Sequence, residues 1–234
     1  MLSAPQLIIC AGLTVGFSII GLIAYRISRA VKAQSTQEHY PTEHSWFLLW
    51  PGRWLAIKCN ALAPVQHALR LHHPHRCSWL EGMAEAQNLF IAPPVHGWVL
   101  VTGGALPDPA EDIDACFHFV VNLSRALGEV QFFETQRFLH HHAWIKARDG
   151  RILRAYAWAG ETLWNQGRPT HAEKRLGFKC FGYGELPREI LASGLDPFAQ
   201  NAQKVPLLAA AWSFDPVAIC DQLHDKQPGV GGVL

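Results

Sequence analysis

The sequence predicts an α+β domain, a largely antiparallel sheet with packed helices, preceded by one N-terminal transmembrane helix. Three observations carry this prediction. Asp149-Gly150 lies between two runs rich in aromatic and branched residues, which is typical of a two-residue hairpin turn. Apolar residues recur at helical spacing from Ile113 to Leu127. Residues Leu7 to Tyr25 are nineteen positions without a charge, long enough to cross roughly 30 Å of hydrocarbon.

Length and composition fit one folded domain with an N-terminal appendage. The 234 residues are 49% hydrophobic and 17% charged, which excludes a disordered chain. Twenty basic and nineteen acidic side chains give a formal charge of +1, so the composition offers no electrostatic argument for nucleic acid as the partner. The six cysteines lack the spacing of zinc or haem sites. We therefore expect free buried thiols and a reducing compartment.

Residues 1–32 are expected to form a single-pass anchor and its basic flank. The basic side chains follow the apolar run directly, at Arg26, Arg29 and Lys32. By the positive-inside rule, the C-terminal part then stays in the cytoplasm, at a bacterial inner membrane. The alternative is a cleaved signal peptide, although that would carry its positive charge before the apolar stretch. Gly12 and Gly16 have the spacing that lets two membrane helices approach, so they indicate either a homodimer or mere composition.

The boundaries of the domain follow from the next change in composition. Residues 33–45 are polar, contain Pro41 and show no periodicity, so they are expected to be a linker. Residues 46–228 are expected to form a single α+β domain, and residues 229–234 a flexible tail. Trp46 to Trp54 contains three tryptophans. This segment is expected either to lie on the membrane or to begin the domain as a strand and turn.

Capping residues predict where the helices of the domain begin. They are followed by apolar residues at helical spacing and occur at Asn60, Ser78, Asp108 and Thr170. The main helix is expected to follow Asp108 and to end at Gly128. A weaker helix is expected at Glu185 to Ala192, and two short ones at Val205 to Trp212 and Pro216 to Leu223.

Runs of branched and aromatic residues predict the strands. Besides the two arms of the hairpin, they lie at Leu89 to Ala92, Trp98 to Thr102, Val130 to Phe133 and Glu161 to Asn165. A regular hairpin that pairs Arg148 with Arg151 fixes which side chains share a face. One face is then expected to carry His140, His142 and Trp144, and the other to carry Arg154, Tyr156 and Trp158.

Two histidines are the first candidate site. His140 and His142 point the same way on a strand and could ligate one metal ion. Catalytic zinc normally has three protein ligands, and a third could come from the cluster His72, His73 and His75 if the fold brings it near. The sequence contains no H-E-x-x-H motif. The competing interpretation is that these are surface histidines or hydrogen-bonded core histidines.

The second candidate site lies on the strand after the hairpin turn. Arg154, Tyr156, Trp158 and Glu161 could hold a polar ligand, because an arginine with flanking aromatic rings and a carboxylate makes bidentate and stacking contacts. The competing interpretation is that Arg154 pairs with Glu161 or Glu134 inside a sheet whose aromatic residues are core. A glycine-rich phosphate loop and the G-x-S-x-G motif of serine nucleophiles are both absent.

Three stretches together resemble a pattern of uncharacterised bacterial proteins. They are GWVLVTGGALP from Gly97, GEVQFF from Gly128, and DGRILRAYAWAGETLWNQG from Asp149. The resemblance covers about residues 89–215, including the AWSFDP that begins at Ala211. It implies a bacterial origin and one coherent domain, and it transfers no functional residue. The apolar N-terminal run departs from the soluble members and suggests a domain fused to an anchor.

The expected function is non-enzymatic. We expect a membrane-anchored cytoplasmic binding or scaffolding module, either an accessory subunit of a membrane complex or an immunity-type protein. Its expected partners are the lipid bilayer and another protein, without a cofactor. The alternative is a histidine-dependent hydrolase, zinc-dependent in one version, that uses His140 and His142.

Overall fold

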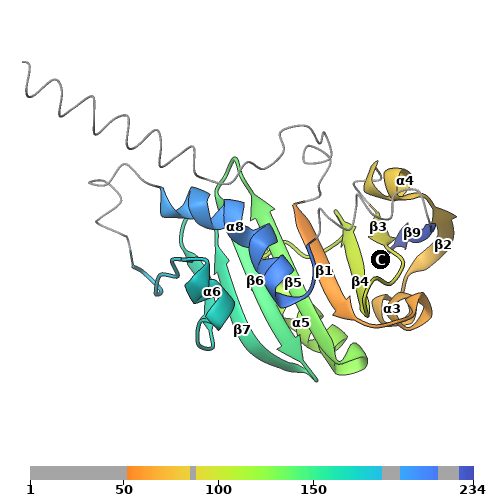
Figure 1. Ribbon diagram of the computed structural model, residues 1–234, viewed down its shortest axis with the longest axis horizontal. Coiled ribbons are helices and arrows are strands. Elements are labelled where there is room, and N and C mark those ends of the chain that lie inside the picture. The colour runs from red at the N-terminus through yellow and green to blue at the C-terminus, as the bar shows by residue number, and fades with distance from the viewer. Residues whose placement is uncertain (1–51, 85–87, 186–195, 216–226) are drawn as a thin grey trace, which may run out of the picture. The chain divides into compact units, whose positions relative to one another are not determined.

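The sheet is the centre of the domain. The computed structural model describes residues 52–84, 88–185, 196–215 and 227–234 (Figure 1). Nine strands formed by these residues make one antiparallel sheet in the order β2-β9-β3-β4-β1-β5-β6-β7-β8. The strands are β1 (Arg53–Lys58), β2 (His72–Cys77), β3 (Leu89–Ile91), β4 (Trp98–Gly103), β5 (Glu129–Gln136), β6 (His141–Arg148), β7 (Arg151–Trp158), β8 (Thr162–Gln166) and β9 (Gly229–Val233). The predicted α+β class with an antiparallel sheet is confirmed.

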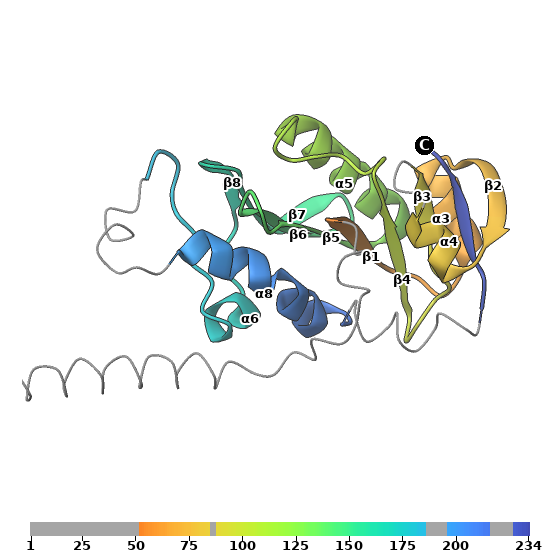
Figure 2. The same cartoon turned by 90° about the horizontal axis from the view of Figure 1, so that it is seen from above.

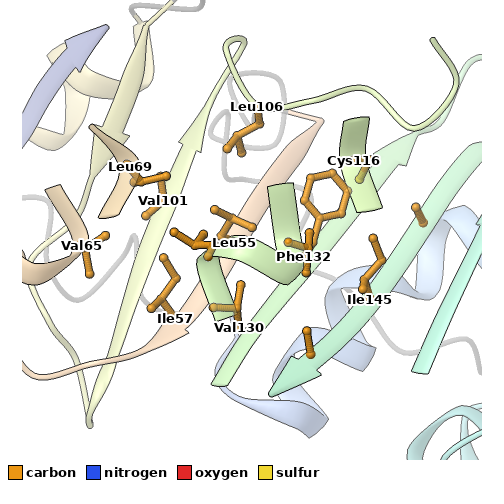
Figure 3. Close-up of a cluster of buried hydrophobic side chains, with 14 of the residues drawn as sticks. Leu55, Ile57, Val65, Leu69, Val101, Leu106, Cys116, Val130, Phe132 and Ile145 are labelled. Carbon is orange, nitrogen blue, oxygen red and sulfur yellow. The ribbon is translucent and has the colours of Figure 1, made fainter. Parts of the chain in front are cut away.

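Helices cover both faces of this sheet. They are α3 (Leu62–Leu69), α4 (Trp79–Ala84), α5 (Ile113–Leu127), α6 (His171–Arg175) and α8 (Pro197–Trp212). Figure 2 shows α5 on one face of β5 to β8, and α6 and α8 on the other. Mainly aliphatic residues fill the core beneath α3 and α5, and Figure 3 shows this cluster, which includes Leu55, Phe132 and Ile145. Aromatic residues dominate the opposite core, which includes Trp54, Trp144 and Tyr156.

The predicted hairpin is present, but its register differs from the expected one. Asp149 and Gly150 have φ of 51° and 75°, as a type I′ turn requires, and Arg148 pairs with Arg151. The register then shifts between Lys146 and Ala147, and Lys146 pairs with Arg154 instead of Leu153. Leu153 is the extra residue and forms a bulge. Every later side chain of β7 therefore lies on the face opposite to the one that a regular hairpin would give it.

This bulge corrects the expected division of the two faces. Trp144 lies opposite Tyr156, and His142 lies opposite Trp158, so His142 shares one face of the sheet with Arg154, Tyr156 and Trp158. The reason is the shape of the two cores. Beneath α5 the two strands contribute mainly small side chains, namely Ala143, Ala147, Ala155 and Ala157, together with Ile145. The large aromatic side chains of β6 and β7 lie on the face covered by α6 and α8.

The C-terminal residues also differ from the expectation of a flexible tail. Residues 229–233 form β9, which pairs with both β2 and β3. Its glycines explain this position, since a Cβ at Gly229 would lie 2.3 Å from the Phe90 ring and one at Gly232 would lie 2.6 Å from Leu71. A strand with larger side chains would not fit between these neighbours.

Local capping signals located α4 and α6, but Asn60 does not cap α3, whose N-cap is Ala61 without a side-chain cap. The capping boxes at Ser78 and Thr170 are present, and Gly128 ends α5. The start of α5 differs, because Asp112 is its N-cap, whereas Asp108 accepts a hydrogen bond from Ala110 N in the preceding turn. The helix expected at Val205 begins earlier, at Pro197, so α8 is longer than predicted.

Several predicted features lie outside the described residues. These are the anchor at Leu7–Tyr25, the linker 33–45, residues 186–192 of the weaker helix and the helix at Pro216–Leu223. Within the described ranges, no helix is long and apolar enough to cross a membrane. Of the segment Trp46–Trp54, the last two residues lie in β1, where Trp54 is fully buried. The cysteines that the structure describes are thiols, not disulfides.

Candidate functional site

A buried polar cluster lies between the sheet and α6. It comprises Trp144, Arg154, Asn165, Glu173 and Cys180, and we call it the Arg154 cluster. Arg154 Nε donates to Glu173 Oε1 at 2.8 Å, and both side chains are only 1% exposed. The Nη1 group donates to Asn165 Oδ1 at 2.8 Å, and the Nη2 group to Cys180 Sγ at 3.2 Å. Backbone carbonyls of β7 and β8 take further hydrogen bonds from Nη1.

Glu173 reaches this position because it also begins α6. Its Oε2 accepts from the backbone N–H of Thr170 at 2.6 Å, and Thr170 Oγ1 accepts from Glu173 N at 3.3 Å. This is a capping box, which satisfies two backbone N–H groups that the helix leaves free. Its other oxygen, Oε1, accepts from both Arg154 and Trp144 Nε1, each at 2.8 Å. One carboxylate therefore both starts the helix and fixes it to β6 and β7.

Aromatic rings enclose the cluster. The ring centroids of Trp144 and Tyr156 are 4.9 Å apart, and those of Trp144 and Phe178 are 4.5 Å apart. The Tyr156 hydroxyl accepts from the backbone N–H of Phe181 at 3.2 Å. Burial raises the pKa of Tyr156, so this phenol stays protonated at neutral pH.

His142 is fully buried beside these rings. Its Nδ1 lies 2.8 Å from the carbonyl oxygen of His140, and a carbonyl can only accept, so Nδ1 carries the proton. Nε2 is then the acceptor for Asn201 Nδ2 at 3.3 Å. The same amide group of Asn201 donates to Lys179 O at 2.7 Å. Burial lowers the pKa of His142 to about 4, so the ring is neutral at physiological pH.

His140 has a different environment. It lies in the turn before β6 with φ of 56°, and its Nδ1 is 2.7 Å from Asp196 Oδ2, the N-cap residue of α8. The cluster His72, His73 and His75 lies on β2, which five strands separate from β6. In the part of the chain that the structure describes, no three His, Cys, Asp or Glu side chains gather in a way that could hold a metal ion.

The structure brings together only three of the four residues of the second candidate site. Arg154, Tyr156 and Trp158 share the face beneath α6 and α8, and Trp158 stacks on Phe198 with centroids 4.0 Å apart. Glu161 is exposed in the turn before β8. The partner of Arg154 is Glu173, neither of the two carboxylates that the sequence suggested. The guanidinium is therefore part of a closed internal network.

A buried carboxyl on the opposite face of the sheet was missed as a site. Glu134 is 2% exposed and accepts from Gln136 Nε2 at 3.0 Å. Burial raises the pKa of Glu134 to about 7, and the negative charge of Asp108 acts in the same direction. Asp108 itself lies 3.5 Å from Arg53. The available signal was the alternation of β5, which places Glu134 on the same face as Phe132.

An open cavity lies at the other end of the strand order, between α3 and β2. Its volume is about 820 Å³, and it is lined by Ala63, Gln66, His67, Arg70, Leu71 and His72. The residues from 61 to 77 include two arginines and four histidines but no carboxylate. The three histidines and the one arginine of β2 are exposed. This surface therefore offers hydrogen-bond donors and positive charge to an anionic group.

Comparisons with protein-family models, with curated proteins and with solved structures gave no match. Function is therefore inferred from the geometry of this chain.

Proposed function

We propose that the protein is a membrane-anchored binding or scaffolding module of a bacterial inner membrane, with its domain in the cytoplasm. It serves as an accessory subunit of a membrane complex or as an immunity-type protein. The uncharged run Leu7–Tyr25 is the anchor, oriented by the basic residues that follow it. One observation carries the proposal. The buried side chains that could take part in chemistry, Arg154, Glu173 and His142, are hydrogen-bonded to other groups of the domain.

The Arg154 cluster has the features of a structural network. An enzyme needs polar groups that converge on a concave pocket. Here all three nitrogens of the Arg154 guanidinium have acceptors within the domain, and both ring nitrogens of His142 are hydrogen-bonded. Burial raises the pKa of Cys180 to about 12, so its thiol is not a nucleophilic thiolate at neutral pH.

The surface around the cavity between α3 and β2 is the proposed recognition site for a protein partner. We call it the α3–β2 surface, and its exposed cationic or titratable side chains are His67, Arg70, His72, His73, His75 and Arg76. Their chemistry fits an acidic segment of a partner protein, because complementary charge steers association and suppresses wrong partners.

The test is an affinity pull-down of the full-length protein solubilised in detergent, with metal analysis of the same sample. A stoichiometric protein partner and no bound metal would support the binding module. One equivalent of zinc without a protein partner would instead favour the histidine-dependent hydrolase, with His140 and His142 as the first residues to replace.

Charge reversal locates the recognition site. Arg70→Glu combined with Arg76→Glu should abolish capture of the partner, because it places two carboxylates on the α3–β2 surface. Arg151→Glu is the matched control, since Arg151 is also exposed but lies at the tip of the β6–β7 hairpin. Equal capture by the double variant and the control would move the recognition site elsewhere on the domain.

A further inference from the structure

The turn between β5 and β6 displays two apolar side chains to solvent. Phe138 is fully exposed, and Leu139 is 61% exposed. They are adjacent in the chain and belong to neither hydrophobic core. Single exposed apolar residues are common on protein surfaces, but a neighbouring aromatic and aliphatic pair at the tip of a turn forms a small apolar patch.

The turn is held by specific contacts on its β6 side. His140 contacts Asp196 at 2.7 Å, and the other oxygen of the same carboxylate caps α8 by accepting from Phe198 N at 2.9 Å. On the β5 side, Thr135 Oγ1 donates to Ala202 O of α8 at 2.7 Å. Contacts with α8 therefore fix both ends of the turn that carries Phe138 and Leu139 between β5 and β6.

The chain enters the domain at the same end of the sheet. Thr135 N donates to Gly52 O at 2.8 Å, and Arg53 pairs with Glu134. Residue 52 therefore lies beside the end of β5, and β5 ends two residues before Phe138. Figure 1 shows the start of β1 and the β5–β6 turn at one end of the sheet, and the β6–β7 turn at the other.

We propose that the β5–β6 turn inserts Phe138 and Leu139 into the interfacial region of the bilayer in which Leu7–Tyr25 is anchored. This inference rests on the anchoring in the proposed function. Aromatic and aliphatic side chains favour the boundary between headgroups and acyl chains. The tether makes this second contact intramolecular, so two side chains are sufficient where a free protein would bind only weakly.

A lipid surface fits this patch better than a protein partner does. A stable protein interface buries about 800 Å² on each partner and contains a central cluster of anchor residues. Two neighbouring side chains on one turn provide only a small part of that area. The pair also lies near Gly52, on the side of the domain from which the chain leads back to the proposed anchor.

Photocrosslinking tests this proposal on the full-length protein in its native membranes. The photoreactive amino acid p-benzoylphenylalanine replaces Phe138 in one variant and Leu153 in a control. Leu153 is an exposed apolar side chain, 46% exposed, at the bulge near the β6–β7 turn. After irradiation, mass spectrometry identifies the adducts, and flotation after alkaline washing shows independently whether the chain is anchored.

A lipid adduct at position 138, with none above background at position 153, is the expected result. A protein adduct at position 138 would overturn the lipid contact and assign the turn to a protein interface. Absence of any adduct at 138 in a chain that still floats with the membrane would overturn the contact and leave the anchor intact. A chain that alkaline washing releases would overturn both the anchor and the contact that rests on it.

Discussion

The buried ion pair between Arg154 and Glu173 gives the sharpest test of the fold. Both side chains are 1% exposed, so water cannot solvate the charge that remains when one partner is removed. Arg154→Met leaves the Glu173 carboxylate with only Trp144 and the Thr170 backbone as donors. Loss of one partner of a buried pair typically destabilises a protein by about 3–5 kcal/mol. We expect Glu173→Gln to fall in the same range, because it leaves a buried guanidinium without its counterion.

The double variant separates the cost of an orphaned charge from the net value of the pair. Replacement of both partners removes both charges, so we expect it to destabilise less than the sum of the single changes, by about 0.5–3 kcal/mol. Urea unfolding followed by tryptophan fluorescence and circular dichroism measures these free energies, and coincident curves would indicate two-state unfolding.

The control for this series is Arg151→Met. Arg151 is exposed at the hairpin tip, so its replacement should change the free energy of unfolding by less than about 0.5 kcal/mol. Two results would refute the closed network. One is a decrease of less than about 1 kcal/mol in the free energy of unfolding of Arg154→Met. The other is a double variant whose destabilisation equals the sum of the two single changes.

Three further changes test the two buried titratable groups and the bulge. Burial raises the pKa of Glu134 from 4.5 to about 7, so the folded state holds this proton more tightly and stability falls as the pH rises through that window. Glu134→Gln should remove the fall and stabilise the protein at alkaline pH by up to about 3 kcal/mol. An unchanged pH slope in urea titrations would contradict this. Burial lowers the pKa of His142 from 6.5 to about 4, so the unfolded chain binds the proton first and stability falls as the pH drops from 6.5 toward 4. His142→Gln should abolish that acid loss in the same titrations, whatever its effect at neutral pH. Gly167 has φ of 78°, and a Cβ there would lie 2.4 Å from Leu153 O at the bulge. Gly167→Ala should therefore lower the melting temperature more than Gly160→Ala, which has φ of 80° but no neighbour within 4 Å. Equal shifts in the two variants would show that the contact with the bulge is unimportant.

Local signals predicted the parts of the fold that local chemistry decides. The turn at Asp149-Gly150 follows from two positive φ angles, and the capping box at Thr170 follows from residues three positions apart. The bulge after Ile152 is different, because tertiary packing selects it. Its register is favoured since small and large side chains of β7 then match two different cores. A comparison of the alanines and aromatic residues on the two arms would have indicated this division.

Contacts between distant segments limited the prediction of the site. The sequence indicated a helix start at Thr170 and an ion pair of Arg154 as one interpretation, but the pairing of Arg154 with Glu173 depends on where α6 lies over the sheet. The position of β9 between β2 and β3 is equally non-local. Glu134 was considered as a partner of Arg154, but the two lie on opposite faces of the sheet, and the alternation of β5 alone cannot show that.

The helices α6 and α8, which cover the face of the sheet that carries Arg154, are each held by one carboxylate, Glu173 for α6 and Asp196 for α8. Each carboxylate caps the start of a helix and also contacts a residue of the β5–β7 region: Glu173 binds Arg154, and Asp196 binds His140. Movement of α6 away from the sheet would separate Glu173 from Trp144 and Arg154 and leave the Arg154 guanidinium without its counterion. The cost of breaking this buried ion pair opposes entry of a ligand beneath α6. Binding is therefore expected at the periphery of the sheet, where the α3–β2 surface and the β5–β6 turn leave cationic and apolar side chains exposed.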